Sequence, residues 1–289
     1  MSRRLHVIHV QTTAKRQEES LAAIGRIIAR TFPQLEARIL VVDNAVTTPH
    51  EQRIAAGISV IRGDNSGREF TGLDRGIAWL EEQGDVLPDA VILLCNDTLL
   101  RDVEVEDFFR LDGDDALRQV DRGRLLGHVD CVVMPMGVFG TSIDHWVRTN
   151  FVLCTYSVLR KITPLRLPFE DAEIFSHSPD EFFRPDVRLS RRYQGFLRGF
   201  LEGHPNLSLW RWHSAGRFHA DNFEAFKLKA KAILCEHYLS VKAKRQGLEF
   251  ADITRRRFPS KETRARARLL LYLTGAWRLV PGFRRRFGL

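Results

Sequence analysis

Three short polar clusters in the first third of the sequence contain residue types that bind metal ions and phosphorylated ligands. They are Asp43-Asn44, the run 64–68 (Asp-Asn-Ser-Gly-Arg) and Asn96-Asp97-Thr98. Hard cations such as Mg²⁺ prefer carboxylate and amide oxygens, and a glycine lets the backbone approach a ligand closely. An aspartate can also accept hydrogen bonds from a ribose hydroxyl or a base. The clusters therefore fit a site for a diphosphate and a divalent cation, with Asp97 as the candidate metal ligand.

Each cluster follows a short apolar segment that is typical of a buried strand. We expect strands over 5–10, 39–42, 58–61 and 90–94, and helices over 15–32 and 71–83. This alternation predicts βαβ units and a parallel sheet, whose ligands bind beyond the carboxyl ends of the strands. Asp and Asn are also common in turns after strands, and that explanation suffices for any one cluster. Three clusters at one edge favour a ligand site.

The second half of the sequence has weaker patterns. We expect a strand over 129–135 and an amphipathic helix over 222–246, while 145–161 is compatible with either a strand or a helix. Residues 165–220 are expected to form helices and loops along one wall of a cleft. The predicted fold class is α/β. The sequence lacks GxGxxG and GxxxxGK[ST], which argues against a Rossmann dinucleotide site and a P-loop.

Composition indicates a globular protein of the cytoplasm. With 289 residues, 44% of them hydrophobic, the chain can bury a core without disulfides. The four cysteines lack metal-site spacings, so we expect reduced, buried thiols. The N-terminal segment is typical of a strand rather than a signal peptide, and no run of eighteen apolar residues occurs. Any membrane contact is therefore expected to be peripheral.

The net charge of +8 is concentrated at the C-terminus. Of 44 basic and 36 acidic residues, eleven and one lie within 255–289, which leaves 33 and 35, or about −2, for the remainder. The segment 261–289 also contains several Leu, Tyr272 and Trp277, a composition typical of an interfacial membrane helix. A C-terminal helix docked on the domain explains it equally well. RNA binding is a weaker third option, because no RNA-binding signature accompanies the charge.

Taken together, these motifs resemble a known family. VVDN (41–44), GDNSGREFTGLDRGI (63–77) and LLCNDT (93–98) resemble the nucleotide-sugar domain of GT-A fold glycosyltransferases of the family 2 type. They are most similar to the bacterial rhamnan- and polysaccharide-synthesis branch, in which Asn-Asp-Ser/Thr replaces Asp-x-Asp. HWVRTNFVLCTYSVLRKI (145–162) resembles the acceptor-side segment of that branch. The resemblance implies a mostly parallel twisted sheet flanked by helices, a helical acceptor-side region and a basic helical tail.

The resemblance also implies residue roles in donor binding. Donor contacts would come from Asp43, Asn65, Gly67, Arg68, Asp74 and Asn96. Asp97 would coordinate the Mg²⁺ or Mn²⁺ through which the diphosphate is bound. Cys95 stands where many relatives carry the first carboxylate of Asp-x-Asp, which weakens the metal site or leaves Asp97 as its only carboxylate.

The acceptor side needs a general base to take a proton from the attacking hydroxyl. RPDVRLSRRYQGFLRG (184–199) resembles the family's acidic residue before a Leu-Ser helix start, which makes Asp186 the first candidate, followed by Glu181 and Asp180. Asp186 could equally cap the following helix after Pro185. Trp210 and Trp212 could stack on sugar rings, although core packing explains them more simply.

The sequence thus predicts a nucleotide-sugar-binding half over 1–130, an acceptor-binding and catalytic half over 131–250, and a basic tail over 251–289. The implied activity is a metal-dependent, inverting glycosyltransferase that moves rhamnose or another hexose from a nucleoside diphosphate sugar to a glycan or lipid-linked glycan acceptor, for lipopolysaccharide or capsule synthesis. It would act at the inner face of the membrane, bound to the anionic surface through 261–289, with no nucleic acid partner. The alternatives are an inactive nucleotide-binding or scaffold protein of the same fold and a basic-tailed RNA-binding protein.

Overall fold

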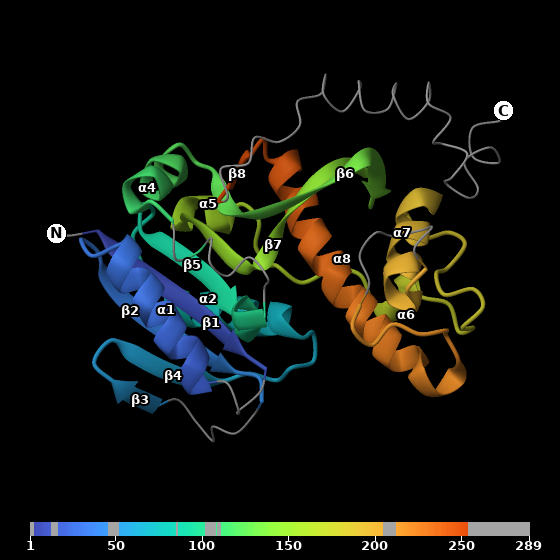
Figure 1. Ribbon diagram of the computed structural model, residues 1–289, viewed down its shortest axis with the longest axis horizontal. Coiled ribbons are helices and arrows are strands. Elements are labelled where there is room, and N and C mark those ends of the chain that lie inside the picture. The colour runs from blue at the N-terminus through green and yellow to red at the C-terminus, as the bar shows by residue number, and fades with distance from the viewer. Residues whose placement is uncertain are drawn as a thin grey trace. The chain divides into compact units, whose positions relative to one another are not determined.

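The computed structural model describes residues 3–12, 17–45, 52–84, 86–101, 108, 111–204 and 212–253. They form a mixed α/β protein with an eight-stranded sheet in the order β3-β4-β2-β1-β5-β7-β6-β8 (Figure 1). The chain divides into two compact units. Unit 1 comprises the described residues of 1–130, 145–168 and 231–256, and unit 2 those of 131–144 and 169–230. The basic tail expected over 251–289 lies outside the described residues, apart from its first three positions.

Four parallel strands form the centre of unit 1. They are β4 (Ile58–Arg62), β2 (Glu36–Asp43), β1 (Arg4–Gln11) and β5 (Val91–Asn96). All four strands expected in this region are confirmed. The sequence analysis missed β3 (Gln52–Ala55), a short antiparallel strand that pairs with β4 at the edge of the sheet.

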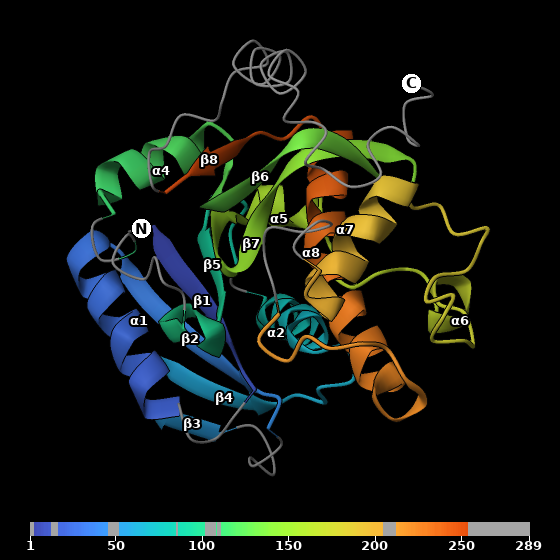
Figure 2. The ribbon, with the colours of Figure 1, turned by 45° about the vertical axis from the view of Figure 1, so that its right-hand side comes forward.

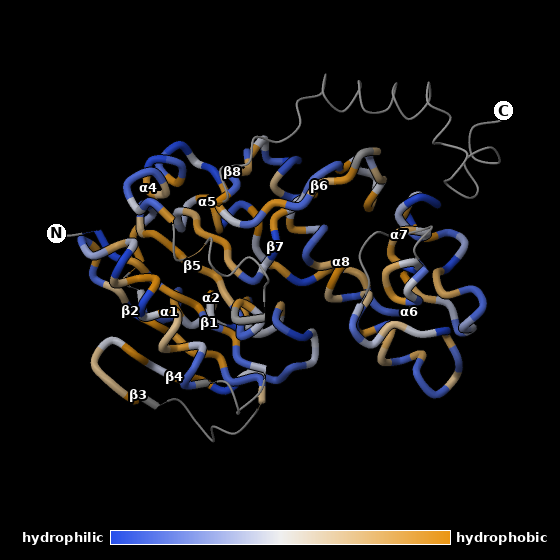
Figure 3. The backbone as a smooth tube through the Cα atoms, viewed as in Figure 1, coloured by the Kyte–Doolittle hydropathy of each residue, from blue (hydrophilic) through white to orange (hydrophobic). Residues whose placement is uncertain are grey.

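Helices α1 (Gln17–Thr31) and α2 (Glu69–Gln83) cover opposite faces of these strands (Figure 2). Because side chains alternate along a strand, odd-numbered residues of β1 and β5 pack with α1 in one buried cluster, which includes Leu5, Val7, Leu93 and Ile24. Even-numbered residues of β1 face α2. Burial on both faces explains why these strands are continuously apolar, as the colouring of β1 and β5 in Figure 3 shows.

Two long strands follow, and the second of them shows what the segment 145–161 forms. After α4 (Gly113–Asp121) the chain forms β6 (Leu125–Val138), longer than expected, and β7 (Thr141–Thr155). The segment 145–161 is thus a strand up to Thr155, antiparallel to β5, and then the short helix α5 (Tyr156–Arg160). The side chain of Thr155 caps α5 by accepting a hydrogen bond from the Val158 N–H.

The remaining elements are mainly helical. They are η2 (Asp97–Arg101), α6 (Asp171–Ile174), α7 (Arg191–Glu202), η3 (Ala220–Asn222), α8 (Phe223–Arg245) and the strand β8 (Phe250–Asp252). α8 confirms the helix expected over 222–246. An aromatic cluster that includes Phe175, Phe182, Phe218 and Phe226 forms the core of unit 2. No described helix is long and apolar enough to cross a membrane.

Candidate functional site

The carboxyl ends of β4, β2, β1 and β5 meet at one edge of unit 1 and bring the three polar clusters to that edge. Asp43 ends β2 and pairs in register with Gln11 of β1 and Arg62 of β4. Asn96 ends β5 and pairs with Val10 of β1. Since β1 separates β2 from β5, Asp43 and Asn96 stand two strand spacings apart, about 10 Å. This is the arrangement that the sequence predicts for the strand ends.

Asp97 is fixed by a residue that the sequence analysis did not single out. The Thr12 N–H donates to Asp97 Oδ2 at 3.1 Å, and the Thr12 hydroxyl contacts Oδ1 at 2.9 Å and Oδ2 at 2.7 Å. Asp97 is only 2% exposed. Thr12 follows β1 directly, so the strand end that holds it also orients the carboxylate. Its position after the first strand was the available signal, but threonine in that position belongs to no ligand motif.

Two residues close to Asp97, His9 and Cys95, belong to the core. Burial lowers the pKa of His9 to about 4, against the opposing effect of the Asp97 carboxylate. His9 Nε2 lies 2.9 Å from the Ser20 hydroxyl. Cys95 packs in the cluster below α1, and burial raises the pKa of its thiol. Residue 95 is therefore a core position in this chain, and Asp97 is the acidic side chain of the segment 93–98.

The loop between β4 and α2 has a strained backbone. Arg68 has a positive φ of 58°, which costs a residue of this type roughly 1–2 kcal/mol, while Asn65, at 55°, is of a type that tolerates positive φ. At Gly67 a Cβ would lie 2.6 Å from the Thr71 side chain. Arg68 Nε is buried, and no described group accepts a hydrogen bond from it. Strain of this kind concentrates at ligand sites, so the loop remains a candidate for donor contacts.

Asp64 stabilises the same loop from within. Its Oδ1 accepts hydrogen bonds from the Ser66 N–H, the Ser66 hydroxyl and the Thr71 hydroxyl. Burial alone would raise the pKa of Asp64, but these hydrogen bonds outweigh it and bring the pKa below its ordinary value. Asp64 is thus a turn-capping residue, as the alternative explanation of these clusters expects.

Asn44 connects the loop to the sheet. Its Nδ2 donates to the Arg68 carbonyl at 2.7 Å. Its Oδ1 lies 2.0 Å from where a Cβ of Gly63 would be and 3.0 Å from that of Gly72. The amide therefore leaves no room for a side chain at position 63, while at position 72 the Val10 side chain, 2.8 Å from the Cβ position, is the nearer obstacle. Asn96 instead makes a local turn, in which its Oδ1 accepts a hydrogen bond from the Thr98 N–H at 3.0 Å.

Asp74, proposed for donor binding, is engaged elsewhere in unit 1. Its two oxygens accept hydrogen bonds from the Leu165 N–H at 2.6 Å and the Arg166 N–H at 3.1 Å. Burial raises its pKa despite these bonds and despite Lys242. The Lys242 amine donates to the carbonyls of Ile162 and Pro164. In this structure Asp74 and Lys242 hold the segment after α5.

The acceptor-side candidates lie in unit 2. Asp186 forms two hydrogen bonds with the Arg184 guanidinium, at 2.8 and 2.9 Å, and these lower the pKa of its exposed carboxyl group. Glu181 instead lines a cavity of about 440 Å³. The charged residues that line this cavity are Asp180, Glu181, Arg191 and Arg198. Asp186 is not among the cavity's lining residues.

The two tryptophans proposed for sugar stacking differ in what is known of them. Trp210 lies outside the described residues. Trp212 is half-buried, with its ring centroid 5.2 Å from that of Phe226 in an edge-to-face contact. Its backbone N–H donates to the Phe200 carbonyl at 3.1 Å. Trp212 therefore packs against the aromatic core of unit 2.

The side chains around Asp97 fit a cation site in which the protein supplies only one or two ligands. No group of three or more His, Cys, Asp or Glu side chains among the described residues could hold a metal by itself. Mg²⁺ is commonly held by one or two carboxylates, with water and substrate phosphates filling the other positions. The carboxylate of Asp97, oriented by Thr12, suits that arrangement.

No protein-family model matches the sequence, and no curated protein does. Among solved structures, the chain is similar to the crystal structure of 4-diphosphocytidyl-2C-methyl-D-erythritol synthase, at 14% sequence identity and a TM-score of 0.37. That likeness covers 58% of this chain and 82% of the other. A likeness at this TM-score supports no functional conclusion, so the function is argued from the site.

Proposed function

We propose that the chain is a glycosyltransferase of the GT-A type. It would transfer a sugar, such as rhamnose or another hexose, from a nucleoside diphosphate to a cell-surface polysaccharide or a lipid-linked glycan. The observation that carries this proposal is the edge at which Asp43 and Asn96 end two strands of the parallel part of the sheet, with Asp97 directly after Asn96, beside the strained loop 63–68. Ligands of open α/β sheets bind at such an edge.

Each group at the edge has a role in donor binding. Mg²⁺ or Mn²⁺, when bound, supplies positive charge that stabilises the departing diphosphate. Asp97 holds the cation, and Thr12 keeps the carboxylate oriented. Asp43 accepts a hydrogen bond from the ribose or the base. The backbone of loop 63–68 lies close to the nucleotide, and Asn44 keeps that loop in shape.

Inverting transfer also requires a group that removes the proton of the acceptor hydroxyl. A carboxylate held by a guanidinium resists protonation, so the pairing of Asp186 with Arg184 argues against the first candidate. We propose Glu181, which lines the cavity of unit 2, as the base to test first. Glu181→Gln should abolish transfer while donor binding persists, and Asp186→Asn should leave transfer largely intact.

The donor site can be tested by ligand-induced stabilisation. Nucleoside diphosphate sugars with different bases are added to the full chain with and without MnCl₂, and the melting temperature is recorded. A ligand at a hundred times its dissociation constant stabilises by about 2.7 kcal/mol. Asp97→Asn should remove the Mn²⁺-dependent part of this stabilisation. The matched control is Asp114→Asn, an exposed aspartate in the first turn of α4. No stabilisation by any donor would contradict the proposal.

A second candidate function is nucleotide binding without turnover. Two observations favour it, namely the thiol of Cys95 in the core and the lack of a three-ligand metal group in the described part of the chain. The discriminating measurement is release of sugar from a radiolabelled donor in the presence of Mn²⁺. Binding with hydrolysis that Asp97→Asn abolishes supports the enzyme. Binding without hydrolysis of any donor supports the binding protein.

The site of action forms a separate part of the proposal. We propose that 261–289, which lies outside the described residues, carries the chain to the anionic inner surface of the membrane. The full chain and a chain ending at residue 260 are compared for sedimentation with anionic vesicles and for RNA binding. Loss of vesicle binding on truncation supports membrane attachment. Loss of RNA binding alone supports the RNA-binding alternative.

A further inference from the structure

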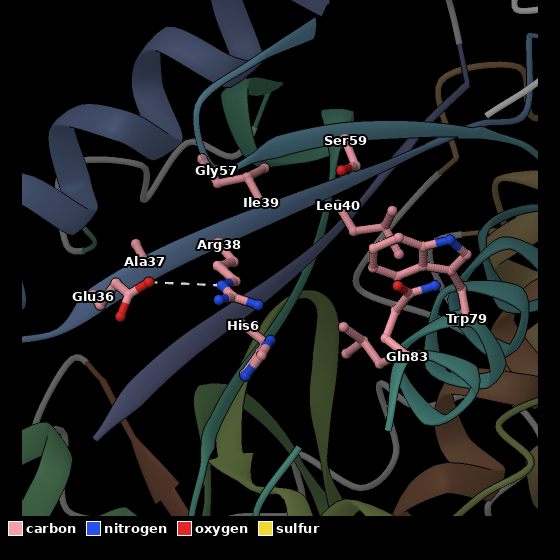
Figure 4. Close-up of a pocket in the computed structure, with 11 residues that line it drawn as sticks. His6, Glu36, Ala37, Arg38, Ile39, Leu40, Gly57, Ser59, Trp79 and Gln83 are labelled. Carbon is pink, nitrogen blue, oxygen red and sulfur yellow. Dashed lines mark ion pairs between the residues drawn. The ribbon is translucent and has the colours of Figure 1, made fainter. Parts of the chain in front are cut away.

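A cavity in each unit is lined by charged residues, but the charges are paired differently. In unit 1, a cavity of about 510 Å³ is lined by Glu36 and Arg38 of β2, among others (Figure 4). Glu36 Oε1 lies 3.7 Å from Arg38 Nε, so these two charges compensate each other. In unit 2, Arg198 lines the cavity of about 440 Å³ but pairs with Glu202, which does not line it. The charge of Arg198 is therefore used outside the cavity, and Glu181 is not its ion-pair partner.

The guanidinium of Arg198 is held on two sides. Its Nε donates to Glu202 Oε2 at 2.8 Å, and its Nη2 donates to Glu202 Oε1 at 3.3 Å, so the pair is bidentate. The Glu202 side chain, one helical turn further along α7, is only 6% exposed. The third nitrogen, Nη1, donates to the Asp180 carbonyl at 3.1 Å. The guanidinium carbon also lies 5.3 Å from the centroid of the Phe218 ring. A planar group with these partners has little freedom to turn.

The carbonyl that Arg198 holds belongs to the backbone of Glu181. It is part of the planar peptide group that joins Asp180 to Glu181, so the hydrogen bond fixes the plane from which Glu181 extends. On the other side of Glu181, Phe182 is 2% exposed, and its ring centroid lies 4.4 Å from that of Phe218. Glu181 itself is exposed. An exposed glutamate at the cavity is thus anchored through both of its neighbours.

We propose that Arg198 is a positioning residue that holds Glu181 in place for removal of the acceptor proton, with Glu202 fixing the guanidinium. This role rests on the proposed function, in which Glu181 is the base. A general base must lie within hydrogen-bond reach of the proton that it removes. A displacement of about 1 Å can lower a rate about a hundred-fold. Arg198 acts through the backbone of Glu181, because each of its three nitrogens already has a protein partner.

Arg198→Lys separates the two interactions of this side chain. A lysine ammonium can still pair with the Glu202 carboxylate, but it lacks the planar fork that reaches both Glu202 and the Asp180 carbonyl. We therefore expect this variant to fold, with a melting temperature close to that of the unmodified chain. The matched control is Arg217→Lys, the same substitution at an exposed arginine of unit 2 that does not line the cavity.

Two measurements are made on the full chain. The first is sugar release from radiolabelled UDP-glucose, dTDP-rhamnose and GDP-mannose in the presence of MnCl₂, analysed as kcat and KM. The second needs no substrate, because a glutamate-specific protease is added to the native protein and cleavage after Glu181 is followed by mass spectrometry. We expect Arg198→Lys to lower kcat at least about ten-fold without changing KM for the donor. Cleavage after Glu181 should become at least about five-fold faster. Arg217→Lys should match the unmodified chain in both measurements.

The outcomes separate this role from the proposed function. Loss of sugar release in Glu181→Gln with full release in Arg198→Lys overturns the positioning role alone. Unchanged cleavage in Arg198→Lys also overturns it, because other contacts would then hold Glu181. Full release in Glu181→Gln, or none from the unmodified chain, contradicts the proposed function and the positioning role with it. If Arg198→Lys does not fold, Glu202→Gln replaces it, since it keeps an oxygen acceptor for Arg198 but removes the charge that orients the guanidinium. The same two changes are then expected.

Discussion

Thr12 and Asp97, 85 residues apart in the sequence, form a backbone and a side-chain hydrogen bond that join the ends of β1 and β5. The threonine hydroxyl contacts both carboxylate oxygens, so it fixes the direction of the carboxylate as well as its position. A candidate metal ligand is thereby oriented by the protein before any cation or substrate is present.

Replacement of Thr12 should lower the stability of the protein when the hydroxyl group is lost. Thr12→Val removes the hydroxyl donor from a buried carboxylate, and we expect the free energy of unfolding to fall by about 1–3 kcal/mol. Thr12→Ser retains the donor and should remain within ~1 kcal/mol of the unmodified chain. Urea unfolding measures both variants. Equal stability of the valine and serine variants would show that the hydroxyl contributes nothing.

Substitution of two helical glycines should have effects of opposite sign. Gly76→Ala places a methyl group 2.5 Å from Ile8, and overpacking of this kind costs about 1–3 kcal/mol. Gly25 lies in α1, where an added methyl group would meet no atom of another element within 4 Å, so Gly25→Ala should stabilise by up to about 1 kcal/mol through helix propensity. Thermal unfolding of the two variants tests the close contact of α2 with the sheet.

Stability should depend on pH through His237. Burial lowers its pKa to about 3, from 6.5 in the unfolded chain. The unfolded state therefore binds more protons between these values, so stability is full above pH 6.5 and falls as the pH decreases through this window. His237→Phe keeps a ring against Trp146, whose centroid lies 4.3 Å away. Between pH 4.5 and 6 its stability should depend on pH less steeply, by about 1.4 kcal/mol per pH unit.

The control for His237 is His204→Asn, at an exposed position. Its unfolding free energy, measured in urea at the same pH values, should follow the unmodified chain. If His237→Phe shows the unmodified pH dependence, another group is responsible for it.

The four cysteines should differ in reactivity. Burial raises the pKa of Cys154 and Cys235 to about 12 and also raises that of Cys95, so these thiols are protonated and enclosed. Cys131 is half-buried. Ellman's reagent should label one thiol rapidly in the native protein and all four in denaturant. Cys131→Ser should remove the rapid phase, and its persistence would mean that a buried thiol is accessible.

The sequence predicted the elements whose pattern is local and strong. The apolar runs of β1, β2, β4 and β5 and the periodicity of α1 and α2 were recognisable, because both faces of the strands are buried and these two helices each bury one face. α8 was expected as an amphipathic helix; the helix is confirmed, but none of its residues from 226 to 243 is exposed, so it is buried or half-buried all round. β3 was missed because four residues, QRIA, give no periodicity. The segment 145–161 was ambiguous because β7 continues directly into α5 without a glycine or proline between them.

Contacts between distant parts of the chain could not be predicted. Asp74 lies in the segment 63–77, whose resemblance to a glycosyltransferase motif implied a role in donor binding, yet it accepts hydrogen bonds from backbone groups 91 and 92 residues away. Thr12 has no motif around it, and its partner becomes evident only when β1 and β5 are placed side by side. Asp186 and Arg184 are neighbours in sequence, but their bidentate geometry depends on side-chain conformation.

The amide of Asn44, wedged between Gly63 and Gly72, has a kinetic consequence. A loop that becomes ordered only when its ligand arrives must lose conformational entropy at that moment, which weakens binding and slows association. The loop 63–68 is instead held in place by the side-chain amide of Asn44. This amide donates a hydrogen bond to the Arg68 carbonyl and fills the space beside Gly63. Association of the proposed nucleotide-sugar donor at this edge should therefore proceed at a rate set by diffusion and charge.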